Sequence, residues 1–199
     1  MRVLLIFKDS VAAERIGVIQ ISAALKKAGH GVRLWIASVS KPQALHEIMR
    51  DFKPKVLGYS AMTGEHIPLV ELNKELRKQY DYYTVFGGPH ATFCQDFINE
   101  DSVDAICIGE GDIVFPEFLN RMENNGDYWN TPTFFVKHNG NTYRNPRNEL
   151  VPELSELPFA DREMLYNVDS NLAKMGTKYF MAARGCPYEC SYCFNVKSI

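Results

Sequence analysis

The first 125 residues alternate between short apolar runs and longer amphipathic segments. Apolar runs of this length predict buried strands, here over 3–7, 32–36, 56–59, 83–86 and 105–108. In the other segments apolar residues recur every three or four positions, which predicts helices over 16–28, 42–52, 67–80, about 93–99, and 113–123. The chain therefore begins with five predicted strands that alternate with five predicted helices.

This alternation is typical of an α/β fold, in which helices cover both faces of a parallel sheet. Right-handed crossover connections favour a doubly wound, flavodoxin-like or Rossmann-like sheet with the strand order 2-1-3-4-5. Ligands of such sheets bind beyond the carboxyl ends of the strands. We therefore expect a binding site in the loops 8–15, 60–66, 87–92 and 109–112.

The pattern changes after residue 125. Residues 133–137 and 142–144 flank Asn139-Gly140, which predicts a β-hairpin with a tight turn. A proline-containing linker without sustained periodicity follows over 145–161, and a further apolar strand is predicted over 179–183. We therefore expect an α/β domain over 1–126, a hairpin and linker over 127–176, and the start of a second domain over 177–199.

The composition is that of an ordinary globular protein, since 46% of the 199 residues are hydrophobic and 23% are charged. A net charge of −2 gives no electrostatic reason to expect a nucleic-acid or membrane-surface partner. The apolar run 3–7 is too short for a signal peptide or a membrane span. Five cysteines, three of them closely spaced, indicate a reducing compartment, and we expect a cytoplasmic protein.

The three cysteines near the end of the chain, Cys186, Cys190 and Cys193, have the spacing C-x₃-C-x₂-C. Thiolates this close together, in a loop that also holds glycine and proline, can converge on one inorganic centre. Three ligands are one fewer than fully ligate a [4Fe–4S] cluster, which would leave one iron open to another ligand. The alternative is that the three cysteines are core residues or half of a zinc site. Cys94 and Cys107 are expected to be small packing residues.

Two loops at the predicted edge of the sheet carry glycines. Gly87 and Gly88 follow the fourth strand, and the absence of Cβ atoms there lets a large ligand approach the backbone. The loop 109–112, with the sequence GEGD, places backbone N–H groups and carboxylates at a helix N-terminus. Both loops suit a bulky cofactor with amide and phosphate groups. Glu110 and Asp112 could instead only cap the helix, and His90 could be a core or turn residue.

Five motifs occur in order along the chain: YSAMTG (59–64), FGGPHAT (86–92), IGEGD (108–112), ELSELPFADRE (153–163) and RGCPYECSYC (184–193). Together they resemble the cobalamin-binding radical S-adenosylmethionine (SAM) enzymes, and the resemblance covers nearly the whole chain. It implies an N-terminal cobalamin (B12) domain, followed by a radical SAM barrel that begins within 177–199 and is truncated here. It also implies that SAM completes the coordination of a [4Fe–4S] cluster held by Cys186, Cys190 and Cys193. The other residues that it places at cobalamin or SAM are Asp9, Ser10, Ser60, Met62, Thr63, Gly87, Gly88, His90, Gly109, Glu110, Gly111 and Tyr192.

The resemblance implies an activity as well. An electron donor such as flavodoxin or ferredoxin would reduce the cluster, SAM would be cleaved to a radical, and methyl transfer, rearrangement or cyclisation would follow. Because few residues follow the cysteine motif, we expect the 199-residue chain alone to be catalytically inactive. The alternative is a vestigial domain that binds no cobalamin and serves as a structural or substrate-docking module. The substrate is not indicated by these residues.

One position departs from a common pattern. Many B12 proteins ligate cobalt with the histidine of an Asp-x-His-x-x-Gly motif after the first strand. Here Asp9 is followed by Val11 at the histidine position and by Glu14 at the glycine position. We therefore expect that no histidine of this loop ligates cobalt, whereas His66 and His90 stay candidates because they follow strands at the same edge.

Overall fold

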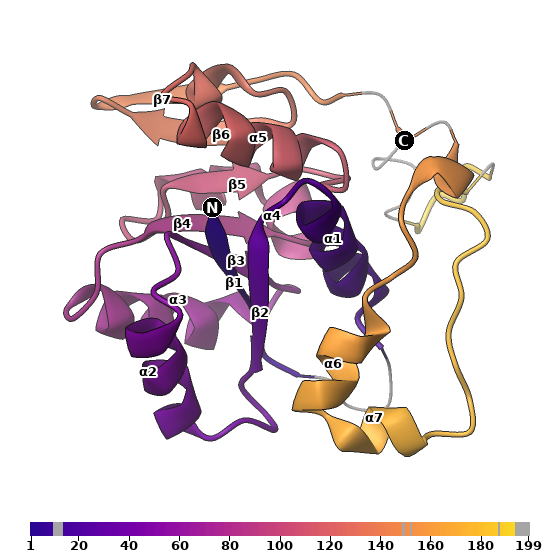
Figure 1. The fold of residues 1–199 in the computed structure, drawn as a ribbon. Coiled ribbons are helices and arrows are strands. Elements are labelled where there is room, and N and C mark those ends of the chain that lie inside the picture. The colour runs from indigo at the N-terminus through magenta and orange to yellow at the C-terminus, as the bar shows by residue number, and fades with distance from the viewer. Residues whose placement is uncertain (10–13, 149, 152, 187, 194–199) are drawn as a thin grey trace.

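The computed structural model describes residues 1–9, 14–148, 150–151, 153–186 and 188–193. The strands of these residues form a mixed sheet in the order β2-β1-β3-β4-β5-β6-β7, and helices cover both of its faces (Figure 1). The parallel strands run in the same direction, so their carboxyl ends meet at one edge of the sheet. This is the edge at which the sequence predicts a binding site.

The first five strands are parallel and have the predicted order. They are β1 (Arg2–Phe7), β2 (Gly31–Ile36), β3 (Val56–Ser60), β4 (Tyr83–Gly87) and β5 (Ala105–Cys107). Strand β1 is buried on both faces, because Val3, Leu5 and Phe7 belong to one hydrophobic core and Leu4 and Ile6 to the other. A strand with two buried faces needs apolar residues at every position, which explains the uninterrupted apolar run.

The predicted hairpin exists, and it extends the same sheet. It consists of β6 (Phe134–His138) and β7 (Asn141–Arg144), with Asn139 and Gly140 at positive φ in the turn. Strand β6 pairs antiparallel with β5, so that Val136 lies opposite Ala105. The sheet therefore has two strands more than the five predicted. The turn residues of a hairpin are a local signal, whereas its pairing with a third strand depends on the tertiary fold.

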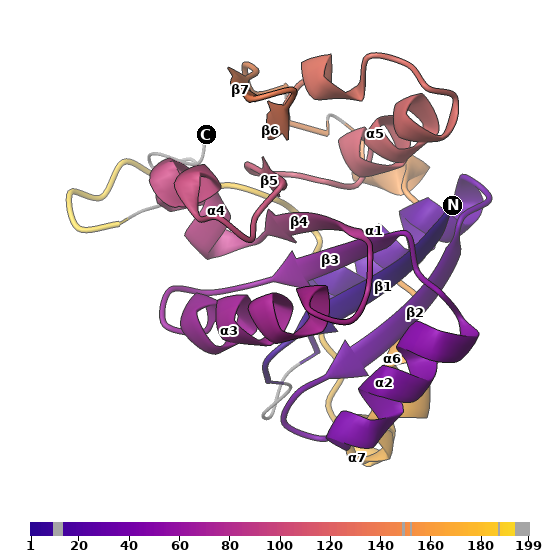
Figure 2. The same cartoon turned by 90° about the vertical axis from the view of Figure 1, so that its left-hand side faces the viewer.

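Helices of two groups cover the sheet. Helices α1 (Ile16–Lys27), α5 (Val114–Glu123), α6 (Arg162–Val168) and α7 (Ser170–Lys174) pack on one face. Helices α2 (Pro42–Asp51), α3 (His66–Arg77) and α4 (Pro89–Phe93) pack on the other (Figure 2). Short 3₁₀ helices lie in the connections: η1 (Gln95–Asn99), η2 (Tyr128–Asn130) and η3 (Leu154–Glu156). Of the helix predicted at about 93–99, only Phe93 belongs to an α-helix, α4, and residues 95–99 form the 3₁₀ helix η1. None of the helices in the described ranges combines the length and the apolar character that crossing a bilayer requires.

The segment after residue 160 departs most from the prediction. Helices α6 and α7 both begin after an aspartate, because Asp161 accepts a hydrogen bond from the N–H of Met164 and Asp169 from that of Asn171. The strand predicted over 179–183 is wrong, since these residues are irregular and Phe180 is 82% exposed. An apolar run forms a strand only where a neighbouring strand pairs with it, and none of the described strands does so here.

Candidate functional site

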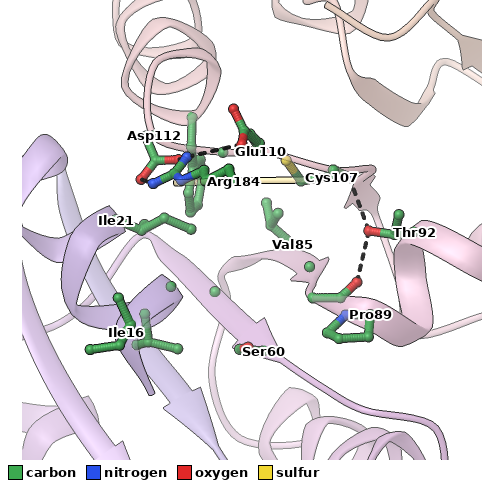
Figure 3. A pocket seen from close by; sticks show the side chains of 18 of the residues that line it. Ile16, Ile21, Ser60, Val85, Pro89, Thr92, Cys107, Glu110, Asp112 and Arg184 are labelled. Carbon is green, nitrogen blue, oxygen red and sulfur yellow. Dashed lines mark hydrogen bonds and ion pairs between the residues drawn. The ribbon is translucent and has the colours of Figure 1, made fainter. Parts of the chain in front are cut away.

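A cavity of about 500 Å³ lies between the carboxyl-terminal edge of the sheet and helices α1 and α5 (Figure 3). Its walls come from β1, β3, β4 and β5, from α1, α4 and α5, from the loops that follow β4, β5 and β7, and from the segment 181–185. This volume is in the range of sites that enclose most of a small organic ligand. The edge predicted from the strand order therefore holds a ligand-sized cavity.

The sheet forms the floor of the cavity in two rows. Leu5, Gly58 and Val85 are register partners on adjacent strands and form the inner row. Ser60 and Gly87 are register partners two residues further along their strands and begin the outer row, which Cys107 continues on β5. Two residues span about 7 Å of strand, so the cavity extends from the polar edge of the sheet to an apolar interior under the helices.

Gly58 leaves the centre of the inner row without a side chain. A Cβ atom at this position would lie 3.0 Å from Cδ2 of Leu5 and 3.4 Å from Cε1 of Phe115 on α5. Val18 and Ile21 of α1 line the cavity as well. Glycine inside a strand is unfavourable by about 0.5–1 kcal/mol relative to alanine, and it often marks a site where a ligand or another backbone approaches. Here the missing side chain lets Leu5 and Phe115 pack closely against the backbone of β3 at the inner end of the cavity.

Gly88 allows the loops after β3 and β4 to approach each other closely. Its φ is +89°, and a Cβ atom would lie 3.0 Å from the carbonyl oxygen of Ala61, which already accepts a hydrogen bond from the N–H of His90 at 3.0 Å. The hydroxyl of Thr92 donates to the carbonyl of Gly88 and accepts from the N–H of Gly109, both at 3.0 Å (Figure 3). These hydrogen bonds hold three loops together at the rim of the cavity.

Charged side chains lie at the mouth of the cavity. Arg184 donates to the two carboxylate oxygens of Asp112 at 2.6 and 3.2 Å, and it lies 3.3 Å from Oε1 of Glu110. Burial disfavours the charged guanidinium, but the carboxylates of Asp112 and Glu110 outweigh this effect and raise the pKa of Arg184. Arg147 also lines the mouth, beside Gly109. The carboxylates of Glu110 and Asp112 thus pair with an arginine from a distant part of the sequence. This pairing was not predicted by either interpretation of the two carboxylates, ligand contact or helix capping.

The predicted cofactor-binding residues divide into two groups. Those that line the cavity are Ser60, Gly87, Gly88, Gly109, Glu110 and Gly111. Asp9, Met62, Thr63, His90 and Tyr192 do not line it, and Ser10 lies outside the described residues. Other residues that line the cavity were not predicted as cofactor-binding residues, among them Leu5, Ile16, Val18, Ile21, Gly58, Val85, Phe115, Arg147, Leu150 and Arg184. Of these, Gly58 carried a usable signal, because it is an isolated glycine inside a predicted strand.

His90 is a core residue beside the cavity, 7% exposed. Its ring stacks on that of His66 with 3.6 Å between centroids, and its Nδ1 lies 3.1 Å from Oγ1 of Thr63. Burial, and then the charge of His66, lower the pKa of His90. The structure thus agrees with the alternative in which His90 is a core residue, and it accounts for the position of Thr63 as well.

Glu14, at the position where many B12 proteins have a glycine, is a buried side chain that links the start of α1 to α6 by hydrogen bonds. Its carboxylate accepts hydrogen bonds from the hydroxyl of Tyr166, from Nε of Arg162 at 3.2 Å and from the N–H of Tyr179 at 3.4 Å. Burial raises the pKa of Glu14, but these hydrogen bonds and the charge of Arg162 lower it by more, so the net shift is downward. Glu14 therefore ties the start of α1 to α6.

The cysteine loop is described as far as Cys193. The N–H of Cys193 donates to the carbonyl of Cys190 at 2.9 Å, and Cys190 is exposed while Cys186 and Cys193 are partly exposed. Within the described ranges no group of three or more His, Cys, Asp or Glu side chains is placed to hold a metal ion. Ligation of a cluster by these three cysteines stays a prediction.

The two other cysteines differ from each other. Cys107 is a buried packing residue, as predicted, and it lines the cavity. Burial, and then the charge of Asp112, raise the pKa of the Cys107 thiol to about 12, so it is neutral at physiological pH. Cys94 is exposed, contrary to the prediction, because it lies at the break between α4 and η1.

Comparisons with known proteins agree with the site. The family described as B12 binding domain matches residues 5–119. The chain is 27% identical over 151 residues to the cobalamin-dependent radical SAM methyltransferase TokK of Streptomyces tokunonensis. This alignment covers 71% of the chain and 22% of TokK. The chain is also 25% identical over 196 residues to the hopanoid C-3 methylase of Methylococcus capsulatus. This second alignment covers 90% of the chain and 35% of the methylase. The chain therefore spans about a fifth to a third of the length of these relatives.

A solved structure shares the fold. It is the radical SAM methyltransferase TsrM from Kitasatospora setae, solved with cobalamin and a [4Fe–4S] cluster bound, which aligns with a TM-score of 0.63 at 18% identity. The alignment covers 79% of this chain and 31% of TsrM. The family match extends over more than half of the chain, and it includes β2 to β5, α1, the end of β1 and the first part of α5. The chain belongs to the B12-binding domain family and is related to the cobalamin-dependent radical SAM methyltransferases.

Proposed function

We propose that the chain binds cobalamin, with the corrin ring over the carboxyl ends of the parallel strands and the nucleotide tail in the cavity. The observation that carries this proposal is the shape of the cavity. It opens at Ser60 and Gly87 on the edge of the sheet and continues to Gly58, where the floor has no side chain. A long ligand with a bulky head outside the sheet and a narrow tail inside matches this shape.

The chemistry of the walls fits the parts of the cofactor. Cobalamin has a wide corrin ring with amide side chains and a tail of phosphate, ribose and a flat benzimidazole base. Leu5 and Val85 on the floor and Phe115 on α5 offer apolar contacts to a flat base. At the mouth, the hydroxyl of Ser60 and the positive charge of Arg147 suit amide and phosphate groups. The side chains therefore change from polar to apolar in the same order as the groups of the cofactor.

A tail that lies inside the cavity cannot also ligate cobalt through its base. None of the described residues that line the cavity is a histidine, and the ring of His90 is held by His66 and Thr63. The proposal therefore includes cobalt without a histidine ligand from the described part of this chain. The role of the protein at this site is to position the corrin and to enclose its tail.

The chain forms part of a radical SAM enzyme in this proposal. Cys186, Cys190 and Cys193 would hold a [4Fe–4S] cluster that SAM completes, and a donor of the flavodoxin or ferredoxin kind would supply electrons. When bound, these cofactors supply a 5′-deoxyadenosyl radical and a methyl group for transfer. Support comes from the cysteine spacing and from the relatives TokK and the hopanoid C-3 methylase, which are named as a methyltransferase and a methylase. In this chain Arg184 ties the residues before Cys186 to the mouth of the cavity.

Titration of the 199-residue chain with hydroxocobalamin and methylcobalamin tests cobalamin binding. We expect saturable binding by calorimetry and an absorption change to the spectrum of cobalamin whose base has left cobalt. Gly58→Val should weaken binding because its side chain would displace Leu5 and Phe115, which line the cavity. No binding at high micromolar cobalamin would overturn the proposal and favour a structural or substrate-docking module.

Anaerobic reconstitution with iron and sulfide tests the cluster. We expect about four iron atoms per chain and the absorption of a [4Fe–4S] cluster. A triple Cys→Ser variant at 186, 190 and 193 should lose both, whereas Cys94→Ser, which changes another exposed cysteine, should keep them. Equal iron content in the two variants would contradict the ligand assignment.

A further inference from the structure

The inner part of the cavity differs from its mouth in polarity. Leu5, Val85 and Phe115 present only hydrocarbon, and Gly58 has no side chain. Tyr59 contributes no polar group there, because its ring stacks on Phe86 on the other face of the sheet. The polar and charged side chains that line the cavity belong to its outer row and mouth: Ser60, Thr92, Glu110, Asp112, Arg147 and Arg184.

The backbone of the inner row is not available to a ligand either. Leu5 and Gly58 pair with each other in the parallel ladder, and Gly58 also pairs with Val85 on β4. Their N–H and C=O groups therefore have partners in the sheet. Cys107, in the adjoining outer row, carries a neutral thiol, which is a weak hydrogen-bond partner. A ligand that reaches the inner row meets almost no hydrogen-bonding group.

We propose that this cavity selects corrinoids by the base of their nucleotide tail, accepting a benzimidazole and rejecting a purine such as adenine. The inference rests on the proposed function, in which the tail occupies the cavity. Dimethylbenzimidazole exposes two methyl groups and one ring nitrogen, whereas adenine carries an amino group with two N–H donors and several ring nitrogens. Each polar group that is buried without a partner weakens binding, by about tenfold or more.

Leu5, Gly58, Val85 and Phe115 are the specificity-determining residues in this proposal. Val85→Thr tests them, because it exchanges a methyl group for a hydroxyl at nearly the same volume and offers a purine a hydrogen-bonding partner. Val56→Thr is the matched control. Val56 lies on β3 two residues before Gly58, belongs to the same core and is 0% exposed, like Val85 at 2%, but it does not line the cavity.

The experiment measures dissociation constants of the chain for three probes by absorption and calorimetry. The probes are hydroxocobalamin, its analogue with adenine as the lower base, and cobinamide, which has no nucleotide tail. We expect hydroxocobalamin to bind at least about tenfold more tightly than the adenine analogue, and cobinamide to bind more weakly than hydroxocobalamin. Val85→Thr should reduce the ratio between the two tailed corrinoids several-fold, and Val56→Thr should leave this ratio unchanged.

The outcomes separate this inference from the proposed function. Equal affinity for hydroxocobalamin and its adenine analogue, with weaker binding of cobinamide, would overturn the selectivity. It would still support a nucleotide tail inside the cavity. Equal affinity for all three probes would show that the tail does not enter the cavity, and would overturn the selectivity while corrinoid binding stands. Failure of every probe to bind would overturn the proposed function itself.

Discussion

The guanidinium of Arg184 donates to both carboxylate oxygens of Asp112, at 2.6 and 3.2 Å, across the mouth of the cavity (Figure 3). The side chains are 19% and 6% exposed, so the pair is shielded from solvent. A two-pronged contact between a guanidinium and a carboxylate constrains direction as well as distance. The residues directly before Cys186 are therefore positioned by the loop that follows β5.

Replacing Asp112 by asparagine should release the segment 181–185 from the mouth of the cavity. Asparagine keeps the shape of the side chain but leaves the charge of Arg184 partly buried beside a neutral amide. We expect faster hydrogen exchange of the amides of 181–185 and a loss of about 1–3 kcal/mol in the free energy of unfolding. Exchange at the wild-type rate in this segment would contradict the assigned role.

The control for this prediction is Asp96→Asn. Asp96 is 92% exposed and lies 3.4 Å from Arg144. Ion pairs at the surface contribute about 0–1 kcal/mol, and this one has poor geometry. We therefore expect Asp96→Asn to change neither the stability by more than about 0.5 kcal/mol nor the exchange of 181–185.

Gly88→Ala and Gly140→Ala separate backbone strain from a steric clash. Both glycines have positive φ, at +89° and +78°, so alanine at either position is strained. Only at Gly88 would the new Cβ atom meet backbone, 3.0 Å from the carbonyl oxygen of Ala61, whereas nothing lies within 4 Å at Gly140. We expect Gly88→Ala to be the more destabilising by about 1–2 kcal/mol in urea unfolding, and to weaken cobalamin binding. Equal effects of the two variants would show that the loop after β3 moves aside.

The position of the cavity could be predicted from the sequence because it depends on strand order. β1 is apolar at every position from Val3 to Phe7, and that run, followed by an amphipathic helix, indicates a parallel sheet. Once the order is known, the carboxyl ends of the strands define the edge. Gly87 and Gly88 are at the edge for the same reason, since Gly87 ends β4 and Gly88 follows it directly.

The inner lining could not be predicted in the same way. Val18 and Ile21 belong to the buried stripe of α1, and an apolar stripe predicts burial without showing whether a side chain meets a core or a cavity. Arg147 and Arg184 reach the mouth from segments with no regular structure, so no periodicity places them there. The strand predicted over 179–183 failed for a related reason, because pairing is a property of neighbours and not of the run itself.

Asn73 on α3 should be among the most sensitive positions for stability. It is fully buried, and its Oδ1 accepts hydrogen bonds from the hydroxyls of Tyr82 at 3.0 Å, Tyr59 at 3.2 Å and Thr84 at 3.3 Å. Asn73→Ala removes their shared acceptor and should lower the free energy of unfolding by about 2–4 kcal/mol in urea titrations. Asn120→Ala, at an exposed position of α5, is the control and should cost less than about 0.5 kcal/mol. A similar cost for both variants would mean that water replaces the amide of Asn73.

The His66–His90 stack makes stability depend on pH in a predictable direction. Burial, and then the charge of His66, lower the pKa of His90, whereas a histidine in the unfolded chain titrates near 6.5. Between these two values the unfolded chain binds a proton that the folded chain does not. The stabilisation is therefore fully present above about pH 6.5 and is lost as the pH falls from there through the lowered pKa of His90.

Nuclear magnetic resonance titration of the His90 ring checks this in the wild type and in His66→Phe. Phenylalanine keeps a ring against His90, where the centroids are 3.6 Å apart, but it removes the neighbouring charge. We expect a midpoint below 6.5 in the wild type and a higher one in the variant, still below 6.5 because His90 stays buried. The loss of stability between pH 7.5 and 5.5 should shrink in His66→Phe accordingly. A wild-type midpoint at or above 6.5 would show that the folded chain accommodates a charged His90, and the predicted loss of stability at low pH would then have another source.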